Sequence, residues 1–116
     1  MHNNKVLSFI GICMKAGHLV SGEFSVEKAV KSGHAWLVLV AADASGNSKK
    51  QYTNMCTYYQ VPLYFISSKE ELGHALGKEY RASLAVLDEN MAKALIKKLQ
   101  EAGTEPVDIT PAETER

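Results

Sequence analysis

The stretch "WLVLVA", residues 36–41, is an uninterrupted apolar run in a chain of 116 residues. A strand with one solvent-exposed face alternates apolar and polar residues, whereas a strand covered on both faces does not. We therefore predict a strand here that is buried on both faces. Such a strand needs helices on both sides of its sheet, so this stretch predicts an α/β fold.

Helix signals precede this strand. Over residues 4–16, apolar side chains recur at the three- and four-residue spacing of a helix, and a glycine supplies the stop. The short "HLVS" of residues 18–21 is suited to an edge strand. A second helix is expected to begin at Ser21 or Gly22 and to end at Gly33.

Helices and strands also alternate after it. Helical spacing over residues 52–59 is followed by the strand-like "LYFI" of residues 63–66. Ser68 and Glu71 then have capping-box spacing, "SLAVL" at residues 83–87 reads as a last strand, and Asp88 caps a last helix. This alternation predicts right-handed crossovers and a largely parallel sheet within a three-layer α/β/α domain.

The formal net charge is zero, but the charges are unevenly distributed. Residues 101–116 carry five acids and one arginine, which leaves 12 basic and 8 acidic residues in the first 100. The acidic tail also contains two prolines and little apolar periodicity, so it is predicted to be disordered. We therefore expect a single domain over residues 1–100, and its excess of positive charge is compatible with a nucleic-acid partner.

Composition excludes several classes of protein. The apolar "VLSFIGIC" of residues 6–13 is too short to span a bilayer, so we expect a cytoplasmic protein without a membrane partner. Cys13 and Cys56 have no spacing typical of zinc sites; they are expected to be small buried hydrophobes, with a disulfide as the alternative.

Evidence for catalysis is weak. In "GHLVSGEF", residues 17–24, two glycines have the spacing of a phosphate-binding loop, but Glu23 and Phe24 stand where that loop has lysine and a hydroxyl. The four histidines are scattered. Asp43 follows a strand, where an acid can serve chemistry, although a turn or cap is the commoner role. We predict no catalytic residue, metal or cofactor.

Two segments favour binding of an anion or RNA. The second helix begins "GEFSVEKAVKSG", which places Lys28 and Lys31 on adjacent turns behind a helix N-terminus. The turn "GKEYRAS", residues 77–83, combines two cations with an aromatic ring, as single-stranded RNA binding favours. A solvated loop without a ligand is the alternative for this turn.

With these elements in place, the sequence resembles the kink-turn RNA-binding family of ribosomal proteins, which includes core proteins of small nucleolar RNA particles. The similarity is greatest to its small bacterial YlxQ-type branch and covers residues 5–99. It rests on "KAGHLVSG", "VEKAVKSGHAWLVLVAADAS", "YYQVPLYFISSKEELGHALGKE" and "AVLDENMAKAL", in this order. The resemblance implies a three-layer α/β/α sandwich with a central, mostly four-stranded mixed sheet that binds structured RNA without catalysis.

The resemblance also assigns residues to an RNA site. Gly22 matches the glycine that lets the backbone approach RNA, and Lys28 matches a lysine that contacts phosphate or base. Lys69 falls near the pocket for a flipped-out base, over which the loop of residues 78–81 closes. The family resemblance and the local sequence patterns described above together predict an RNA-binding set. It consists of Gly22, Phe24, Ser25, Lys28, Lys31, Ser45, Lys49, Lys69, Lys78, Tyr80 and Arg81.

Two positions depart from the family pattern. The asparagine and glutamate that bind guanines in relatives are replaced by Phe24 and Ser25. Phe24 is expected to stack on a base, to pack in the core or to face a partner. The main prediction is therefore a monomeric, non-enzymatic RNA-binding protein of the ribosome or translation system, with ribosomal RNA as one possible partner. The alternative is a protein-interaction module that has lost kink-turn recognition.

Overall fold

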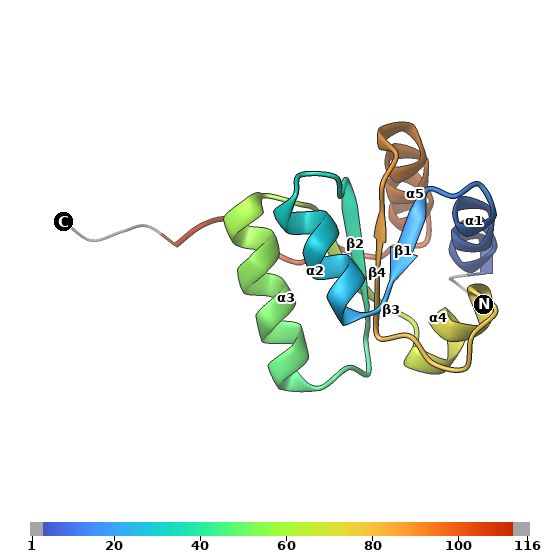
Figure 1. Cartoon of the computed structure of the whole chain (residues 1–116), viewed down its shortest axis with the longest axis horizontal. Coiled ribbons are helices and arrows are strands. Elements are labelled where there is room, and N and C mark those ends of the chain that lie inside the picture. The colour runs from blue at the N-terminus through green and yellow to red at the C-terminus, as the bar shows by residue number, and fades with distance from the viewer. Residues whose placement is uncertain (1–3, 113–116) are drawn as a thin grey trace.

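The computed structural model describes residues 4–112, and its helices and strands alternate along the chain (Figure 1). In chain order the elements are α1 (Asn4–Lys15), β1 (Leu19–Ser21), α2 (Glu23–Lys31), β2 (Leu37–Ala41), α3 (Gly46–Tyr59), β3 (Leu63–Ile66), α4 (Lys69–Ala75), β4 (Ser83–Val86) and α5 (Glu89–Glu101). The predicted capping box at Ser68 and Glu71 and the cap at Asp88 are both confirmed.

The strands form one sheet between two layers of helices. Helices α2 and α3 cover one face, and α1, α4 and α5 cover the other (Figure 1). All five residues of β2 are buried: Leu37, Leu39 and Ala41 belong to the core below α1, α4 and α5, while Val38 and Val40 belong to the core below α2 and α3. The prediction from "WLVLVA" is confirmed, and the fold is the expected α/β/α sandwich.

The sheet is mixed and four-stranded, as the family resemblance implied, whereas the expectation of largely parallel pairing from the alternating elements was wrong. The strand order is β1-β4-β2-β3, with β2 and β3 parallel and both pairings of β4 antiparallel. The reason is that α4 has only seven residues and does not carry the chain back to the opposite end of the sheet before β4 begins. The Arg81 N–H donates to the Lys69 carbonyl at 3.0 Å, so β4 starts at the end of the sheet where β3 finished.

The beginning of the acidic tail packs on the domain. The Val107 N–H donates to the Leu63 carbonyl at 2.8 Å, and Gln60 Nε2 donates to the Ile109 carbonyl at 2.8 Å. Val107 and Ile109 also contact the core below α2 and α3. The sequence-based prediction of a disordered tail did not foresee these contacts. The division at residue 100 stays a prediction, and residues 113–116 of the tail lie outside the described part of the chain.

Both cysteines are free and buried, as predicted. Cys13 lies in the core on one face of the sheet and Cys56 in the core on the other, so the two thiols are on opposite sides of the sheet. Within residues 4–112, no helix is long and apolar enough to cross a membrane. The same residues contain no group of three or more His, Cys, Asp or Glu side chains arranged to hold a metal ion.

Candidate functional site

The candidate site lies at one end of the sheet. Strands β1, β2 and β3 run in the same direction, and each leads at its carboxyl end into the helix that follows it in the chain. The first turns of α2, α3 and α4 therefore meet at the lower end of the molecule in Figure 1, beside the loop of residues 77–82 that leads into β4. In α/β folds this end of the sheet is the usual place for ligands.

Gly22 forms the corner between β1 and α2. Its φ of 94° and ψ of 153° lie in a region that only glycine enters readily. The Gly22 N–H donates to the Ser83 carbonyl at 3.0 Å, and its own carbonyl accepts the first hydrogen bond of α2, from the Val26 N–H at 2.9 Å. The corner is thus tied to β4 on one side and to α2 on the other, with no side chain on the outside of the turn.

Arg81 joins the loop of residues 77–82 to that corner. Its Nε donates to Ser21 Oγ at 3.0 Å, and its Nη1 donates to the Tyr80 carbonyl at 2.9 Å. Because Ser21 is the last residue of β1, the guanidinium lies next to Gly22. The predicted residues Gly22 and Arg81, 59 positions apart in the sequence, are therefore brought together.

Gly73 sets the position of the same loop from the other side. A Cβ at residue 73 would lie 2.6 Å from the Glu79 carbonyl oxygen and 2.8 Å from Tyr80 Cα. The backbone of the loop therefore packs directly on α4, and the Lys78 N–H donates to the Gly73 carbonyl at 2.8 Å. This close approach leaves the side chains of Lys78, Glu79 and Tyr80 in solvent.

Asp43 has a structural role in this arrangement. Its Oδ1 accepts a hydrogen bond from the backbone N–H of Lys69 at 2.9 Å, which connects the loop after β2 to the first turn of α4. This hydrogen bond fits the predicted turn or cap role of Asp43 better than a catalytic role. Ser45 caps α3, since its Oγ accepts from the Ser48 N–H at 3.1 Å.

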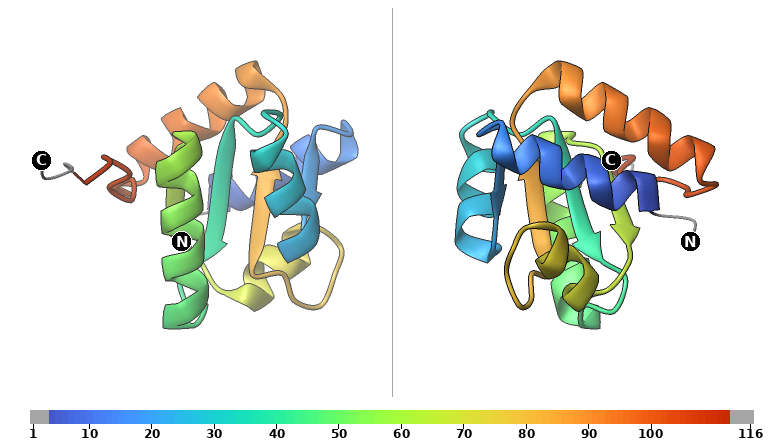
Figure 2. Two further views of the ribbon diagram at one scale, coloured as in Figure 1. Left: turned by 60° about the vertical axis from the view of Figure 1, so that its left-hand side comes forward. Right: turned by 90° about the vertical axis from the view of Figure 1, so that its right-hand side faces the viewer.

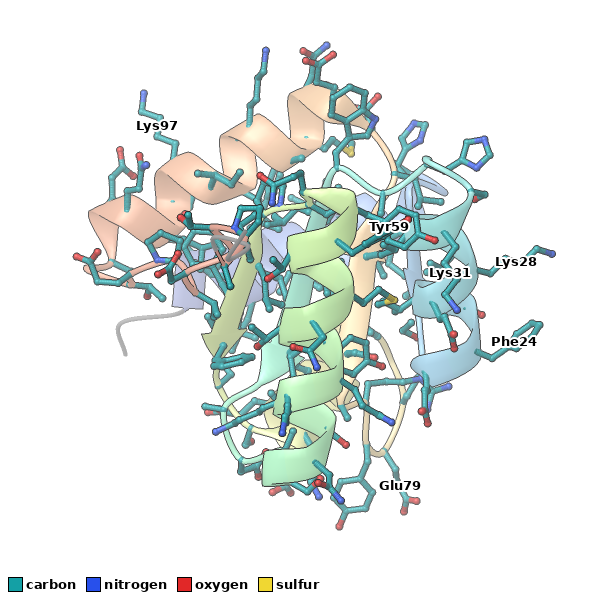
Figure 3. All side chains as sticks on the ribbon, turned by 90° about the vertical axis from the view of Figure 1, so that its left-hand side faces the viewer. Phe24, Lys28, Lys31, Tyr59, Glu79 and Lys97 are labelled. Atoms are coloured by element: carbon teal, nitrogen blue, oxygen red, sulfur yellow. The ribbon has the colours of Figure 1, made fainter. Side chains whose placement is uncertain are left out.

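The outer surface of α2 presents an aromatic ring and a cation. Phe24 is 77% exposed, so the hypothesis that its ring packs in the core is wrong. Figure 3 shows Phe24 and Lys28 projecting to the same side of α2, away from the rest of the domain. Lys31 instead turns back to Glu27, and its ammonium lies 2.6 Å from the carboxylate. That hydrogen bond raises the pKa of Lys31, and it directs the Lys31 charge away from the Phe24 surface.

The remaining predicted residues are spread around this end of the sheet. Ser25 is half-buried on α2, Lys69 is exposed at the start of α4, and Tyr80 is 61% exposed in the loop. Lys49 lies on α3 with its ammonium 5.3 Å from the centre of the Phe65 ring, in a cation–π contact. Arg81 is thus the residue that connects the corner at Gly22 with Lys69 and Tyr80, while Lys31 and Lys49 are engaged elsewhere.

Acidic side chains border the site as well. Glu23 is in the first turn of α2, and Glu70 and Glu71 are in the first turn of α4. Glu79 extends from the loop at the bottom of Figure 3. These carboxylates oppose a phosphate at the starts of α2 and α4, whereas the first turn of α3 has no acidic residue. The positive charges at Lys28, Lys69, Lys78 and Arg81 are therefore offset by these carboxylates, and this end of the sheet is not uniformly basic.

The residues that hold the loop and the corner in place were not identified from the sequence. Ser21 and Gly73 were not selected, because their roles depend on contacts with the loop of residues 77–82. One available signal was the glycine inside the "SKEELGHALG" helix. An interior helix glycine costs about 1 kcal/mol relative to alanine, so it often has a packing reason.

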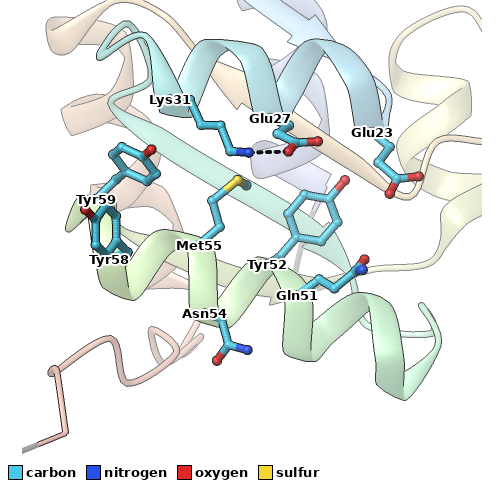
Figure 4. Close-up of a pocket in the computed structure, with 9 residues that line it drawn as sticks. All are labelled: Glu23, Glu27, Lys31, Gln51, Tyr52, Asn54, Met55, Tyr58 and Tyr59. Atoms are coloured by element: carbon cyan, nitrogen blue, oxygen red, sulfur yellow. Dashed lines mark hydrogen bonds and ion pairs between the residues drawn. The ribbon is translucent and has the colours of Figure 1, made fainter.

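A separate groove lies between α2 and α3 (Figure 4). Its lining includes Glu23 and Glu27 from α2 and Tyr52, Met55 and Tyr59 from α3. Tyr59 is 39% exposed. At the floor, the Tyr52 hydroxyl and Ser83 Oγ are 2.7 Å apart, and burial raises the pKa of Tyr52. Burial also raises the pKa of the nearby Cys56 thiol to about 12, which makes it a poor nucleophile.

Comparison with known proteins identifies relatives over most of the chain. The model of the family described as "Ribosomal protein L7Ae/L30e/S12e/Gadd45 family" matches residues 4–96. A Bacillus subtilis (strain 168) protein, RNA-binding protein YlxQ, is 41% identical over 90 residues, which are 78% of this chain and 90% of the relative. The Enterococcus faecium protein of the same name is 34% identical over 79% of this chain and 88% of its own length.

Solved structures of other proteins have the same fold as this chain. A Bacillus halodurans protein of unknown function superposes with a TM-score of 0.80 at 33% identity, over 83% of this chain and 97% of its own. The 15.5 kD RNA binding protein of Giardia lamblia superposes with a TM-score of 0.71 at 22% identity, over 87% of this chain and 89% of its own. The second similarity supports the fold alone.

Proposed function

The chain belongs to the ribosomal protein L7Ae/L30e/S12e/Gadd45 family, and we propose that it binds structured RNA without catalysing a reaction. The matches confirm the predicted family and its bacterial YlxQ-type branch. The proposed RNA surface consists of the Gly22 corner, the outer side of α2 at Phe24 and Lys28, and the loop of residues 77–82. We call it the corner surface.

One observation carries this assignment: Arg81 joins the loop to the corner through Ser21. The bond fixes the loop beside the corner from which α2 begins, so three features suited to RNA lie at one end of the sheet. These are a backbone corner without a side chain, cations at Lys28 and Lys78, and exposed rings at Phe24 and Tyr80. Cations that contact phosphate and aromatic rings that stack on unpaired bases are the usual elements of RNA recognition.

The kind of RNA follows from the positions that depart from the family pattern. Phe24 has no group to hydrogen-bond a guanine edge, but its exposed ring can stack on a base, typically for about 1–3 kcal/mol. We therefore propose an RNA with unpaired bases in an internal loop. A ribosomal RNA is the first candidate, since the family is named for ribosomal proteins. Such a partner would place the protein in the cytoplasm, linked to the ribosome or translation.

Fluorescence anisotropy with labelled RNA tests the proposal. The probes are an RNA hairpin with a kink-turn internal loop, the same hairpin with its G·A pairs replaced by Watson–Crick pairs, and a fully paired duplex. We expect the hairpin with the internal loop to bind more tightly than the duplex, with an affinity that falls as salt rises. Equal and weak binding to all probes would contradict an RNA-binding function.

Single lysine variants locate the surface. Lys28→Gln and Lys78→Gln should each weaken binding and lower the salt slope by about one, as loss of one phosphate contact does. Lys97→Gln is the matched control, because Lys97 is also exposed but lies on α5 (Figure 3). Lys31→Gln should have a smaller effect than Lys28→Gln, since Lys31 is paired with Glu27. Equal effects of Lys97→Gln and Lys28→Gln would place the RNA elsewhere.

The alternative is a protein-interaction module, which the exposure of Phe24 also favours. Phe24→Ala separates the two functions. On an RNA surface it should weaken binding of the internal-loop hairpin by about 5- to 150-fold, the equivalent of a lost stacking contact. If Phe24→Ala leaves RNA affinity unchanged and abolishes a nuclease-resistant protein complex, the interaction module is the better assignment.

A further inference from the structure

The outer side of α1 has a surface that the proposed RNA site does not use. Along the exposed stripe of this helix, Ile12 is 53% exposed and stands between Lys5 and Lys15 in the sequence. Helix α1 lies in the layer opposite to α2, between α4 and α5 (Figure 2, right). A partner on this side would leave the corner surface open to RNA.

Two hollows flank Ile12, and Ser8 and Ile12 line both of them. The larger, of about 680 Å³, lies between α1 and α4 and is also lined by Leu7 and Ala75. The smaller, of about 320 Å³, lies on the α5 side and is also lined by Phe9. The two hollows and the Ile12 ridge between them form a continuous, largely apolar surface, which we call the α1 surface.

The floor of the larger hollow depends on Gly11. A Cβ at this position would lie 3.2 Å from the Ala75 carbonyl oxygen, a tight contact with backbone. Glycine therefore lets α1 and α4 approach closely, and it leaves the groove without a side chain at its base. The groove is a feature of the packed helices rather than of a mobile side chain.

Cations border the α1 surface. Lys5 and Lys15 lie at the two ends of the Ile12 stripe, and Lys98 lies on the α5 side with its ammonium 5.2 Å from the centre of the Phe9 ring. Within the described residues, ion pairs of lysine with a carboxylate are formed by Lys31 and Lys93, so these three lysines have none.

The other charges on the surface come from α4. Glu71 faces the larger hollow, but its Oε1 already accepts a hydrogen bond from the Ser68 N–H at 3.0 Å in the capping box. His74 lines the same hollow and adds no negative charge. The surface thus offers apolar hollows bordered by three lysines and one carboxylate, a net positive charge that is the complement of an acidic amphipathic segment.

We propose that the α1 surface binds an amphipathic helix of a partner protein that carries acidic residues beside its apolar face. Apolar side chains of that helix, three or four positions apart, would fill the hollows on the two sides of Ile12. Its carboxylates would pair with Lys5, Lys15 and Lys98. An RNA is the less suitable occupant, because the aliphatic side chains of Leu7, Ile12 and Ala75 offer a base no ring on which to stack.

Selection from a peptide library tests this proposal without RNA. The full chain is used to select helical peptides of about five turns from a random display library, with counter-selection against Ile12→Asp. We expect enriched peptides with apolar residues at helical spacing and flanking Asp or Glu. An enriched basic sequence, or no enrichment over the Ile12→Asp chain, would overturn the proposal.

Affinities of an enriched peptide provide the second step. Ile12→Asp should weaken its binding by about tenfold or more, as loss of a central contact does, and the Lys15→Glu, Lys98→Glu double variant should weaken it and reverse its salt dependence. Phe24→Ala should leave it unchanged. Both variants of the α1 surface should still bind the internal-loop hairpin like the parent chain if they are folded; loss of RNA binding by folded variants would assign this face to RNA instead.

Discussion

Substitution of Gly73 by alanine is the sharpest test of how the corner surface is built. The added Cβ would lie 2.6 Å from the Glu79 carbonyl oxygen, 2.7 Å from the Glu79 carbonyl carbon and 2.8 Å from Tyr80 Cα. All three atoms belong to the backbone, so no side chain can turn aside to make room. The loop or α4 must move by roughly 0.5–1 Å to restore an ordinary contact distance.

Two opposing effects determine the change in stability. Overpacking of this kind costs about 1–3 kcal/mol, whereas alanine inside a helix is favoured over glycine by about 1 kcal/mol. The free energy of unfolding of Gly73→Ala should therefore fall by about 0–2 kcal/mol, and the variant should stay folded at room temperature. Urea unfolding followed by circular dichroism measures this difference.

The effect on RNA binding should exceed what this loss of stability explains. The shift of the loop disturbs the hydrogen bond from the Arg81 N–H to Lys69 and the pairing of its side chain with Ser21. RNA binding then has to bring the loop back to its parental position, and one or two such bonds are worth about 1–2 kcal/mol, so affinity for the internal-loop hairpin should fall about 5- to 30-fold. Gly46→Ala is the matched control, because a Cβ there meets nothing within 4 Å. A folded Gly73→Ala chain with parental RNA affinity would refute the reasoning.

Three further predictions concern the scaffold. Gly22→Ala should lower the free energy of unfolding by about 1–3 kcal/mol in a urea titration, because residue 22 has a φ of 94°. Tyr52→Phe should cost about 1–2 kcal/mol, since it leaves the buried Ser83 hydroxyl without its partner; a double-mutant cycle with Ser83→Ala should show coupling between the two. Burial raises the pKa of Cys56 from 9.0 to about 12, so the contribution of this thiol to stability should be constant below about pH 9 and fall between pH 9 and 12, by at most about 1.4 kcal/mol per unit. Cys56→Val should flatten that part of the profile, and an unchanged profile would contradict the assignment.

The sequence predicted the elements that depend on neighbouring residues. The strand at residues 63–66 and the capping box at Ser68 appear where local patterns placed them. The full burial of β2 also followed from its composition. Local patterns succeed here because hydrophobic periodicity and capping are properties of short segments.

The direction of β4 could not be predicted in the same way. Alternating helices and strands suggest parallel pairing, but α4 is only seven residues long and its chain returns to the end of the sheet that it left. The position of Lys31 was missed for a related reason. Helical spacing places it near Lys28, whereas its ammonium is directed to Glu27, four residues earlier.

The construction of the corner surface explains which of its residues can vary. The loop of residues 77–82 is held by backbone contacts to Gly73 and Lys69 and by one side chain, Arg81. None of these contacts uses the side chain of Lys78, Glu79 or Tyr80, which are exposed. Substitutions at these three positions should therefore change what the loop recognises without changing where it lies. The same holds for Phe24, whose exposed side chain can differ from the asparagine that the family resemblance implies there, while Gly22 keeps the corner in place. If the corner surface binds RNA as proposed, RNA preference and fold are carried by different residues of that surface, which is why the sequence can establish the family before it establishes the ligand.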